Sequence, residues 1–193
     1  MIKSLLNSAI VLLALSIGGN AHAGLIFDPS NTGSSVNTTL TDCFGFSCSV
    51  DTTMNDLDPL SAMLNLGDTA TFDFFDIEVG GVALGKFDIA ATLAFASPGG
   101  AASDTGNGSY GSFLGLFSAG TLSWNGPVSV ALGNGTEYTV ALEDGVALGV
   151  GNTATVKAFV TLDKIAPVPE PGTLALLGMG LAGLGFARRK QSV

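Results

Sequence analysis

The feature that most constrains the fold is a hydrophobic period of two along the middle of the chain. In residues 87–95 and 153–162, apolar side chains largely alternate with small or polar ones. Successive side chains of a β-strand point to opposite faces of a sheet, so this spacing is typical of strands with one buried face. Residues 128–132 and 138–142 alternate in the same way around Asn134-Gly135, which is a strong hairpin signal.

The other patterns of the body, residues 24–166, also indicate strands. The phase of the alternation reverses between Phe74 and Phe75, which predicts a β-bulge there. Further strands are predicted at residues 36–41, 113–117 and 121–124, and no long helical pattern occurs. About eight short strands with Gly- and Asn-rich turns favour an all-β domain, a single antiparallel β-sandwich of jelly-roll or immunoglobulin-like type.

Two regions of this sandwich are predicted in more detail. The core is expected to hold four phenylalanines that share the inward phase, Phe72, Phe74, Phe87 and Phe95. The Gly-rich stretch 97–109 is expected to form a polar loop, and such loops often carry binding residues.

The N-terminus has the three parts of a secretory signal. Lys3 supplies a cationic start, Leu5–Ile17 an apolar run, and Ala21-His22-Ala23 a cleavage site of small residues. Thirteen apolar residues are too few for a transmembrane helix, which needs about 20. We therefore predict that residues 1–23 are a signal helix removed before Gly24, with the general secretion machinery and signal peptidase as partners.

The C-terminus, residues 167–193, has a second ordered pattern. Val168-Pro169-Glu170-Pro171-Gly172 precedes an apolar segment at about 173–187, and the basic residues Arg188, Arg189 and Lys190 follow it. A basic flank indicates the cytoplasmic side of a membrane. The segment is short for a permanent span, so we predict a transmembrane helix that holds the protein only transiently.

The Pro169-Glu170-Pro171 motif, the apolar helix and the basic end together resemble the PEP-CTERM sorting signal of Gram-negative bacteria. The resemblance covers about residues 167–190. It implies an exosortase, a membrane-embedded transpeptidase that removes the helix, as a partner. It also implies a host that produces exopolysaccharide and a destination at the cell surface or outside the cell.

Charge and histidine content exclude several function classes. The chain carries a formal net charge of −9, and residues 24–166 contain three lysines, no arginine and fifteen acidic residues. Nucleic acid is therefore not an expected partner, because phosphate binding needs clustered Lys and Arg. Signal cleavage would also remove His22, the only histidine, so Ser-His-Asp, Cys-His and common zinc sites lack their imidazole.

The remaining candidates for chemistry are a cysteine pair and a group of acids. Cys43 and Cys48 are the only cysteines, and in an oxidising compartment we predict a disulfide between them rather than a redox pair. Calcium prefers carboxylate oxygens, so the acids that lie close in sequence are candidates for a calcium site, namely Asp56, Asp58, Asp73, Asp76 and Glu78. These acids form neither an EF-hand loop nor a Gly-rich nonapeptide repeat, so no metal centre and no cofactor are expected.

Other side chains were weighed for binding. Trp124, Tyr110 and Tyr138 offer rings for sugar stacking, although core packing is the default for aromatic side chains. The threonine pairs at 69 and 71 and at 153 and 155 are too few for an ice-binding array. Asn37, Asn107 and Asn134 fit the glycosylation pattern, which an Asn- and Thr-rich chain also produces by chance.

The sequence therefore predicts a non-enzymatic exported protein, a structural or adhesive component of the surface or of an exopolysaccharide matrix. A carbohydrate- or calcium-binding module is the alternative. A secreted hydrolase that uses paired carboxylates is a third reading, since glycoside hydrolysis needs no histidine.

The intact mass of the exported protein tests both ends at once. We expect a chain that begins at Gly24 and lacks the apolar C-terminal segment, because both segments act only during transport. Mass spectrometry of protein recovered from the cell surface or the medium measures this. A mass equal to that of all 193 residues would contradict the prediction.

Overall fold

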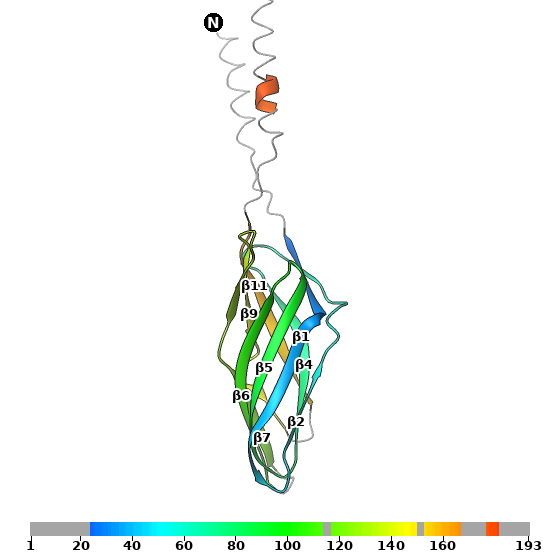
Figure 1. Ribbon diagram of the computed structural model, residues 1–193, viewed down its shortest axis with the longest axis vertical. Helices are drawn as coiled ribbons and strands as arrows, with labels where there is room; N and C mark the ends of the chain where they lie inside the picture. The colour runs from blue at the N-terminus through cyan, green and yellow to red at the C-terminus, as the bar shows by residue number, and fades with distance from the viewer. Residues whose placement is uncertain (1–23, 114–116, 150–152, 167–176, 182–193) are drawn as a thin grey trace, which may run out of the picture.

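The computed structural model describes residues 24–113, 117–149, 153–166 and 177–181. The body is all-β and antiparallel, as the periodicity predicts, and is built from two curled sheets (Figure 1). Its strands are β1 (Leu25–Gly45), β2 (Ser49–Met54), β3 (Ala62–Leu64), β4 (Thr69–Gly80), β5 (Ala83–Ser97), β6 (Ala101–Phe113), β7 (Phe117–Trp124), β8 (Val128–Ala131), β9 (Glu137–Leu142), β10 (Val146–Ala147) and β11 (Thr153–Lys164).

One sheet has six strands and the other has five. The six-stranded sheet has the order β10-β7-β6-β5-β1-β3, and the five-stranded sheet has the order β2-β4-β11-β9-β8. Strand β1 runs along the body in Figure 1 and is longer than the predicted strand 36–41 that it contains. Its pairing with β5 has three register shifts, which let one long strand follow the curl of the sheet.

Both ends of the body lie at the same pole. Leu25 pairs with Leu64, and three residues further the amide of Gly67 donates to the carbonyl of Leu162 near the end of β11. The opposite pole holds the connection from β1 to β2, because Gly45 pairs with Ala83 and Ser49 pairs with Gly80. We call this second region the distal pole.

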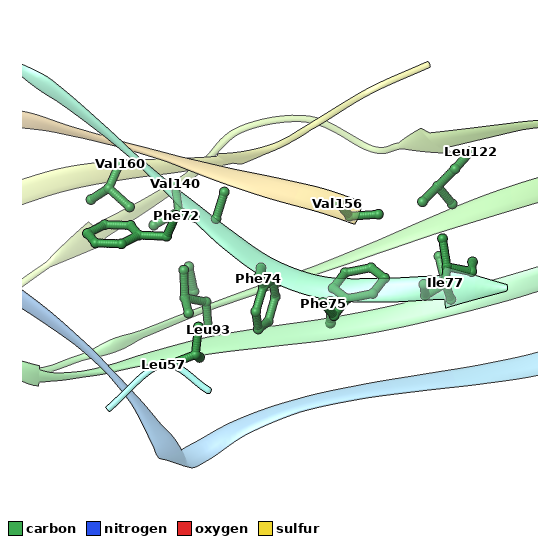
Figure 2. Close-up of a cluster of buried hydrophobic side chains, with 14 of the residues drawn as sticks. Leu57, Phe72, Phe74, Phe75, Ile77, Leu93, Leu122, Val140, Val156 and Val160 are labelled. Atoms are coloured by element: carbon green, nitrogen blue, oxygen red, sulfur yellow. The ribbon is translucent and has the colours of Figure 1, made fainter. Parts of the chain in front are cut away.

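The two sheets share one hydrophobic core (Figure 2). Leu93 and Leu122 enter it from the six-stranded sheet, and Val140 and Val156 enter from the five-stranded sheet. The four phenylalanines expected in the core are all buried. Burial of such side chains contributes about 1.5–3 kcal/mol each and is the main source of stability of the body.

The β-bulge predicted at Phe74 and Phe75 is confirmed. Val156 of β11 pairs with Phe75 while Lys157 pairs with Asp73, so Phe74 is the extra residue. The bulge turns both rings inward, and each is fully buried. Their centroids lie 5.3 Å apart in an edge-to-face arrangement, which is the favoured geometry of aromatic pairs.

The predicted polar loop at residues 97–109 is wrong for most of its length. Only a tight turn at residues 98–100 separates β5 from β6, and β6 begins at Ala101. Its glycines are part of the strand because inner-face aromatic side chains lie opposite them. Phe87 pairs with Gly108, and Trp124 pairs with Gly106. A Cβ at Gly108 would overlap the Phe87 ring, so only glycine fits there.

The same arrangement recurs one step further towards the distal pole. Tyr110 of β6 pairs with Gly85 of β5 on one side and with Gly120 of β7 on the other. A Cβ added to Gly85 would lie 2.5 Å from Cζ of Tyr110. Each large ring therefore covers a neighbouring glycine, a device that stabilises glycine-containing strands.

Two other local predictions have different outcomes. The hairpin around Asn134-Gly135 is confirmed, since β8 pairs with β9 and Gly135 has a φ of 92° that suits glycine. Of the strand predicted at residues 113–117, residues 114–116 lie outside the described part of the chain, whereas Phe113 ends β6 and Phe117 begins β7. These two residues pair with each other in the sheet.

The flanking helices fall almost wholly outside the described residues. Residues 177–181 are helical, which agrees with part of the predicted helix at 173–187. The signal helix at 1–23 lies outside the described part of the chain. Within the described residues, no helix has the length and apolar character needed to cross a membrane.

A glycine substitution tests the packing of β6 on Phe87. We expect Gly108→Ala to lower the free energy of unfolding by about 1–3 kcal/mol, because the added methyl group must displace a fully buried ring. Denaturant unfolding measures this. Gly133→Ala is the matched control, since nothing lies within 4 Å of its Cβ position and it should be close to neutral. Equal stabilities of the two variants would contradict the packing argument.

Candidate functional site

A disulfide closes the connection between β1 and β2 at the distal pole. Cys43 and Cys48 are bonded, as the sequence predicts, with their Cα atoms 5.9 Å apart. The amide of Phe46 donates to the carbonyl of Val82, which ties the loop to the adjacent turn between β4 and β5. The loop is therefore held at both of its sides, by a covalent bond and by a backbone hydrogen bond.

This loop presents apolar side chains to solvent. Phe44 is 81% exposed and Phe46 is 96% exposed, and Leu84 beside them is 61% exposed. Exposing such side chains opposes the hydrophobic effect, so a cluster of them commonly marks a contact surface. The buried phenylalanines of the core show that the chain can enclose this residue type elsewhere.

A hollow of about 640 Å³ lies beside the loop, on the outer side of the six-stranded sheet. Phe44 and Leu84 pair across β1 and β5, and the small residues Gly111 and Ala119 continue the same row across β6 and β7. Large side chains at one end of the row and small ones at the other leave a depression between them. We call it the distal hollow.

The row of residues beside Phe44 and Leu84 gives the distal hollow polar groups. Asp42 pairs with Lys86, whose Nζ lies 3.8 Å from the Asp42 carboxylate, and Lys86 pairs with Ser109. The side chain of Lys86 is 68% exposed and that of Asp42 is 70% exposed. An exposed ion pair adds little stability, so both groups are available to a ligand.

Tyr110 lies in the strand beneath the distal hollow, with its ring buried on the inner side of the sheet. Its hydroxyl proton is shared between two backbone carbonyls, 3.1 Å from that of Ser49 and 3.2 Å from that of Gly80. Burial raises the pKa of Tyr110 above its ordinary value. The phenol therefore holds β6 to the β2–β4 side of the body and stays neutral.

A second hollow, of about 400 Å³, lies further along the same side of the sheet. Its lining comes from β1, β5 and β6 and the end of β7, and consists mainly of small polar side chains: Asn37, Thr39, Asp88, Thr105, Asn107 and Asn125. The Asn125 amide donates to the Thr105 hydroxyl at 2.7 Å. We call this the middle hollow.

The structure separates the acids that were weighed as a calcium site. Asp56 and Asp58 accept hydrogen bonds from Asn31 and Ser30 of β1, which anchors the connection after β2. Asp73, Asp76 and Glu78 lie along β4, where Asp76 accepts from Thr155. Within the described residues, no group of three or more His, Cys, Asp or Glu side chains comes together. The five acids therefore do not form one site.

The aromatic rings considered for sugar stacking lie mostly in the core. Tyr110 and Tyr138 are buried, so neither ring can stack on a ligand. Trp124 is half-buried in an edge-to-face pair with Phe75, and its Nε1 has no hydrogen-bond partner among the described residues. Core packing, which is the default expectation, is therefore confirmed for both tyrosines, because their rings cover the glycines of neighbouring strands or pack on other aromatic rings.

Sequence reasoning missed Phe44, Phe46 and the two hollows. The one available signal was the pair of phenylalanines inside a short cysteine loop, where the chain is too constrained to bury both. The hollows had no signal, since they depend on the register of four strands. The weighed threonines have local roles: Thr69 is hydrogen-bonded to Thr161 across β4 and β11.

The predicted processing residues lie elsewhere. The cleavage-site residues Ala21 and Ala23, the motif Val168–Gly172 and the basic residues Arg188, Arg189 and Lys190 all lie outside the described residues. Their individual roles stay predictions. Gly24 is described and directly precedes β1.

Comparison with known proteins bears on this C-terminal segment. A family model described as the PEP-CTERM protein-sorting motif matches residues 167–190. The match confirms the resemblance drawn from Pro169-Glu170-Pro171, and it implies an exported, surface-directed protein processed by an exosortase-type enzyme. No curated protein and no solved structure matches the chain.

An alkaline titration tests the two tyrosines, which are the only ones in the sequence. Burial raises the pKa of Tyr138 from 10.0 to about 12, and its hydroxyl donates to the carbonyl of Gly99 at 3.0 Å. The unfolded chain loses this proton first, so the contribution of Tyr138 to the free energy of unfolding should be fully present below pH 10 and be lost as the pH rises towards 12.

Phenolate absorbance and denaturant unfolding over this pH range measure the effect. Tyr138→Phe is the control and should show a smaller alkaline decline. Ionisation of both tyrosines at pH 10.0 in protein that is still folded would contradict the assignment.

Proposed function

We propose that the chain is a non-enzymatic exported protein whose body is a single β-sandwich, sorted through its C-terminal tail. It acts as a structural or adhesive component of the cell surface or of an exopolysaccharide matrix. The observation that carries the proposal is the match of the PEP-CTERM motif to residues 167–190. The predicted signal cleavage before Gly24 supplies the matching export step.

The arrangement of the body supports an adhesive role. Gly24 and Ala166 end the described body at one pole, where the Ala166 amide donates to Thr136. The exposed Phe44 and Phe46 lie at the other pole. A body retained through its C-terminal end would therefore direct these side chains outwards.

The disulfide supports the same destination. Disulfides persist in oxidising compartments and are rare in the cytosol of mesophiles. The Cys43–Cys48 bond closes a short loop, which restricts the unfolded chain and keeps Phe44 and Phe46 in place. The disulfide therefore holds the loop in place without contacts from a partner protein.

The assignment as a non-enzyme rests on the residue inventory. With His22 removed, the exported chain has no imidazole for general base catalysis at neutral pH. The carboxylates of β4 belong to an exposed strand face rather than to a hollow. A carbohydrate-binding module is the second candidate, and the two hollows on the six-stranded sheet favour it.

Deletion of the tail tests the sorting step. Removal of Val168–Val193 should release the protein from the surface and from extracellular polymer, because the exosortase substrate is then absent. Immunoblots of cell-surface, polymer and medium fractions measure this. The control is the disulfide, which should still form in the released protein and so exclude misfolding. An unchanged distribution between the fractions would refute sorting by the tail.

A further inference from the structure

The two hollows belong to one continuous surface. Exposed side chains of β1, β5, β6 and β7 form the outer face of the six-stranded sheet, and the strand register arranges them in rows across it. The first two rows, which border the distal hollow, are Phe44–Leu84–Gly111–Ala119 and Asp42–Lys86–Ser109–Thr121.

The next two rows border the middle hollow and are made of Thr39–Asp88–Asn107–Ser123 and Asn37–Ala90–Thr105, with Asn125 beside Thr105. Adjacent rows are two residues apart along β5 and β6, which corresponds to about 6.8 Å. The outer face is therefore a strip that begins with apolar side chains at the distal pole and continues with hydroxyl and amide groups.

The charge of this strip differs from that of the opposite sheet. Its charged side chains in these four rows are Asp42, Lys86 and Asp88, and the first two are paired. The exposed side of the five-stranded sheet carries five acids, Asp51, Asp73, Glu78, Glu137 and Asp163, against two lysines, Lys157 and Lys164. The body is thus acidic, but the strip with the hollows is nearly neutral.

We propose that the outer face of the six-stranded sheet binds one chain of a neutral polysaccharide, which occupies the distal hollow and the middle hollow together. This inference rests on the proposed function and adds the surface and the ligand class to it. A polymer with apolar ring faces and many hydroxyl groups matches a strip that offers an aromatic ring first and small polar side chains after it.

In the distal hollow, the apolar face of one sugar ring packs on Phe44 and Leu84. Its hydroxyl groups donate to Asp42 and accept from Lys86, and both side chains are exposed in the next row. In the middle hollow, Asp88 accepts and the amides of Asn37 and Asn107 both donate and accept, which suits a hydroxyl-rich ligand.

The surface is prepared for binding before the ligand arrives. Residues in the two hollows lie on paired strands, and the disulfide restrains Phe44. Binding to side chains held in this way loses less conformational entropy than binding to a mobile loop. A small area of contact in each row is then enough for binding, because several rows contact the same polysaccharide chain.

Charge selects a neutral polymer over an acidic one. Fifteen acidic residues against three lysines in residues 24–166 repel an anionic polysaccharide, and the only lysine of the strip is paired with Asp42. Phe44 could instead contact a second copy of this chain, and the test below distinguishes self-association from polysaccharide binding.

The test uses the full chain in detergent and measures binding to immobilised cellulose, xylan, mannan and dextran, with alginate as the acidic comparison. We expect saturable binding to at least one neutral polysaccharide and none to alginate. Phe44→Ala in the distal hollow and Asn107→Ala in the middle hollow should each weaken that binding by about tenfold. Ala119→Phe, which fills the distal hollow, should have the same effect.

Two controls separate the hollows from general stickiness. Phe46→Ala removes a side chain that is more exposed than Phe44 but lines neither hollow, and Thr71→Ala alters the exposed side of the opposite sheet. Both should bind as the unchanged protein does. Melting temperatures of all variants should agree, which shows that losses of binding do not come from unfolding.

Three outcomes would overturn the inference. They are no binding to any of the neutral polysaccharides, binding by Phe44→Ala and Asn107→Ala that is as strong as that of the unchanged protein, and self-association that Phe44→Ala abolishes in sedimentation. Measuring whether the same variants reach the cell surface shows whether the proposed function fails as well as the polysaccharide inference. Variants that are still sorted to the surface through the tail leave the proposed function standing.

Discussion

The six-stranded sheet depends on the contact between large rings and glycines on neighbouring strands. Phe87 covers Gly108, Tyr110 covers Gly85, and Trp124 covers Gly106. A glycine-rich strand pays a high entropic cost and has no side chains of its own to bury. The rings supply that apolar surface from the adjacent strand, and Phe87 and Tyr110 also contact each other. Without these pairs, the inner side of β6 would lose most of its apolar packing, and β6 is a central strand of the sheet.

The outer face follows from the same arrangement. Because side chains alternate across a strand, the residues between the covered glycines must point to solvent. Ser109 and Asn107 flank Gly108 and therefore lie on the outer face, where they contribute to the two hollows. The pattern that packs the core from one side thus produces a polar strip on the other. The β-bulge of β4 has a related effect on the opposite sheet, since it brings Phe74 and Phe75 into the core together.

Function is divided along the chain in a way that matches this architecture. The segment at 167–190 carries the sorting motif, and the described body carries the exposed phenylalanines and the two hollows. Both ends of the body lie at one pole, and the disulfide loop with Phe44 and Phe46 lies at the other. The acidic side chains spread over the exposed side of the five-stranded sheet keep such a body soluble.

The sequence by itself determined the all-β class, the bulge at Phe74, the hairpin at Asn134-Gly135, the disulfide and the sorting motif. Each of these depends on residues close together in the chain. Only the tertiary structure decided that residues 101–109 form a strand, and that Asn37 and Asn107 line the same hollow. These features depend on pairing between distant strands, because a glycine is favourable in a strand only when a ring from its neighbour covers it. Local composition therefore indicated a loop where long-range packing produced the centre of a sheet.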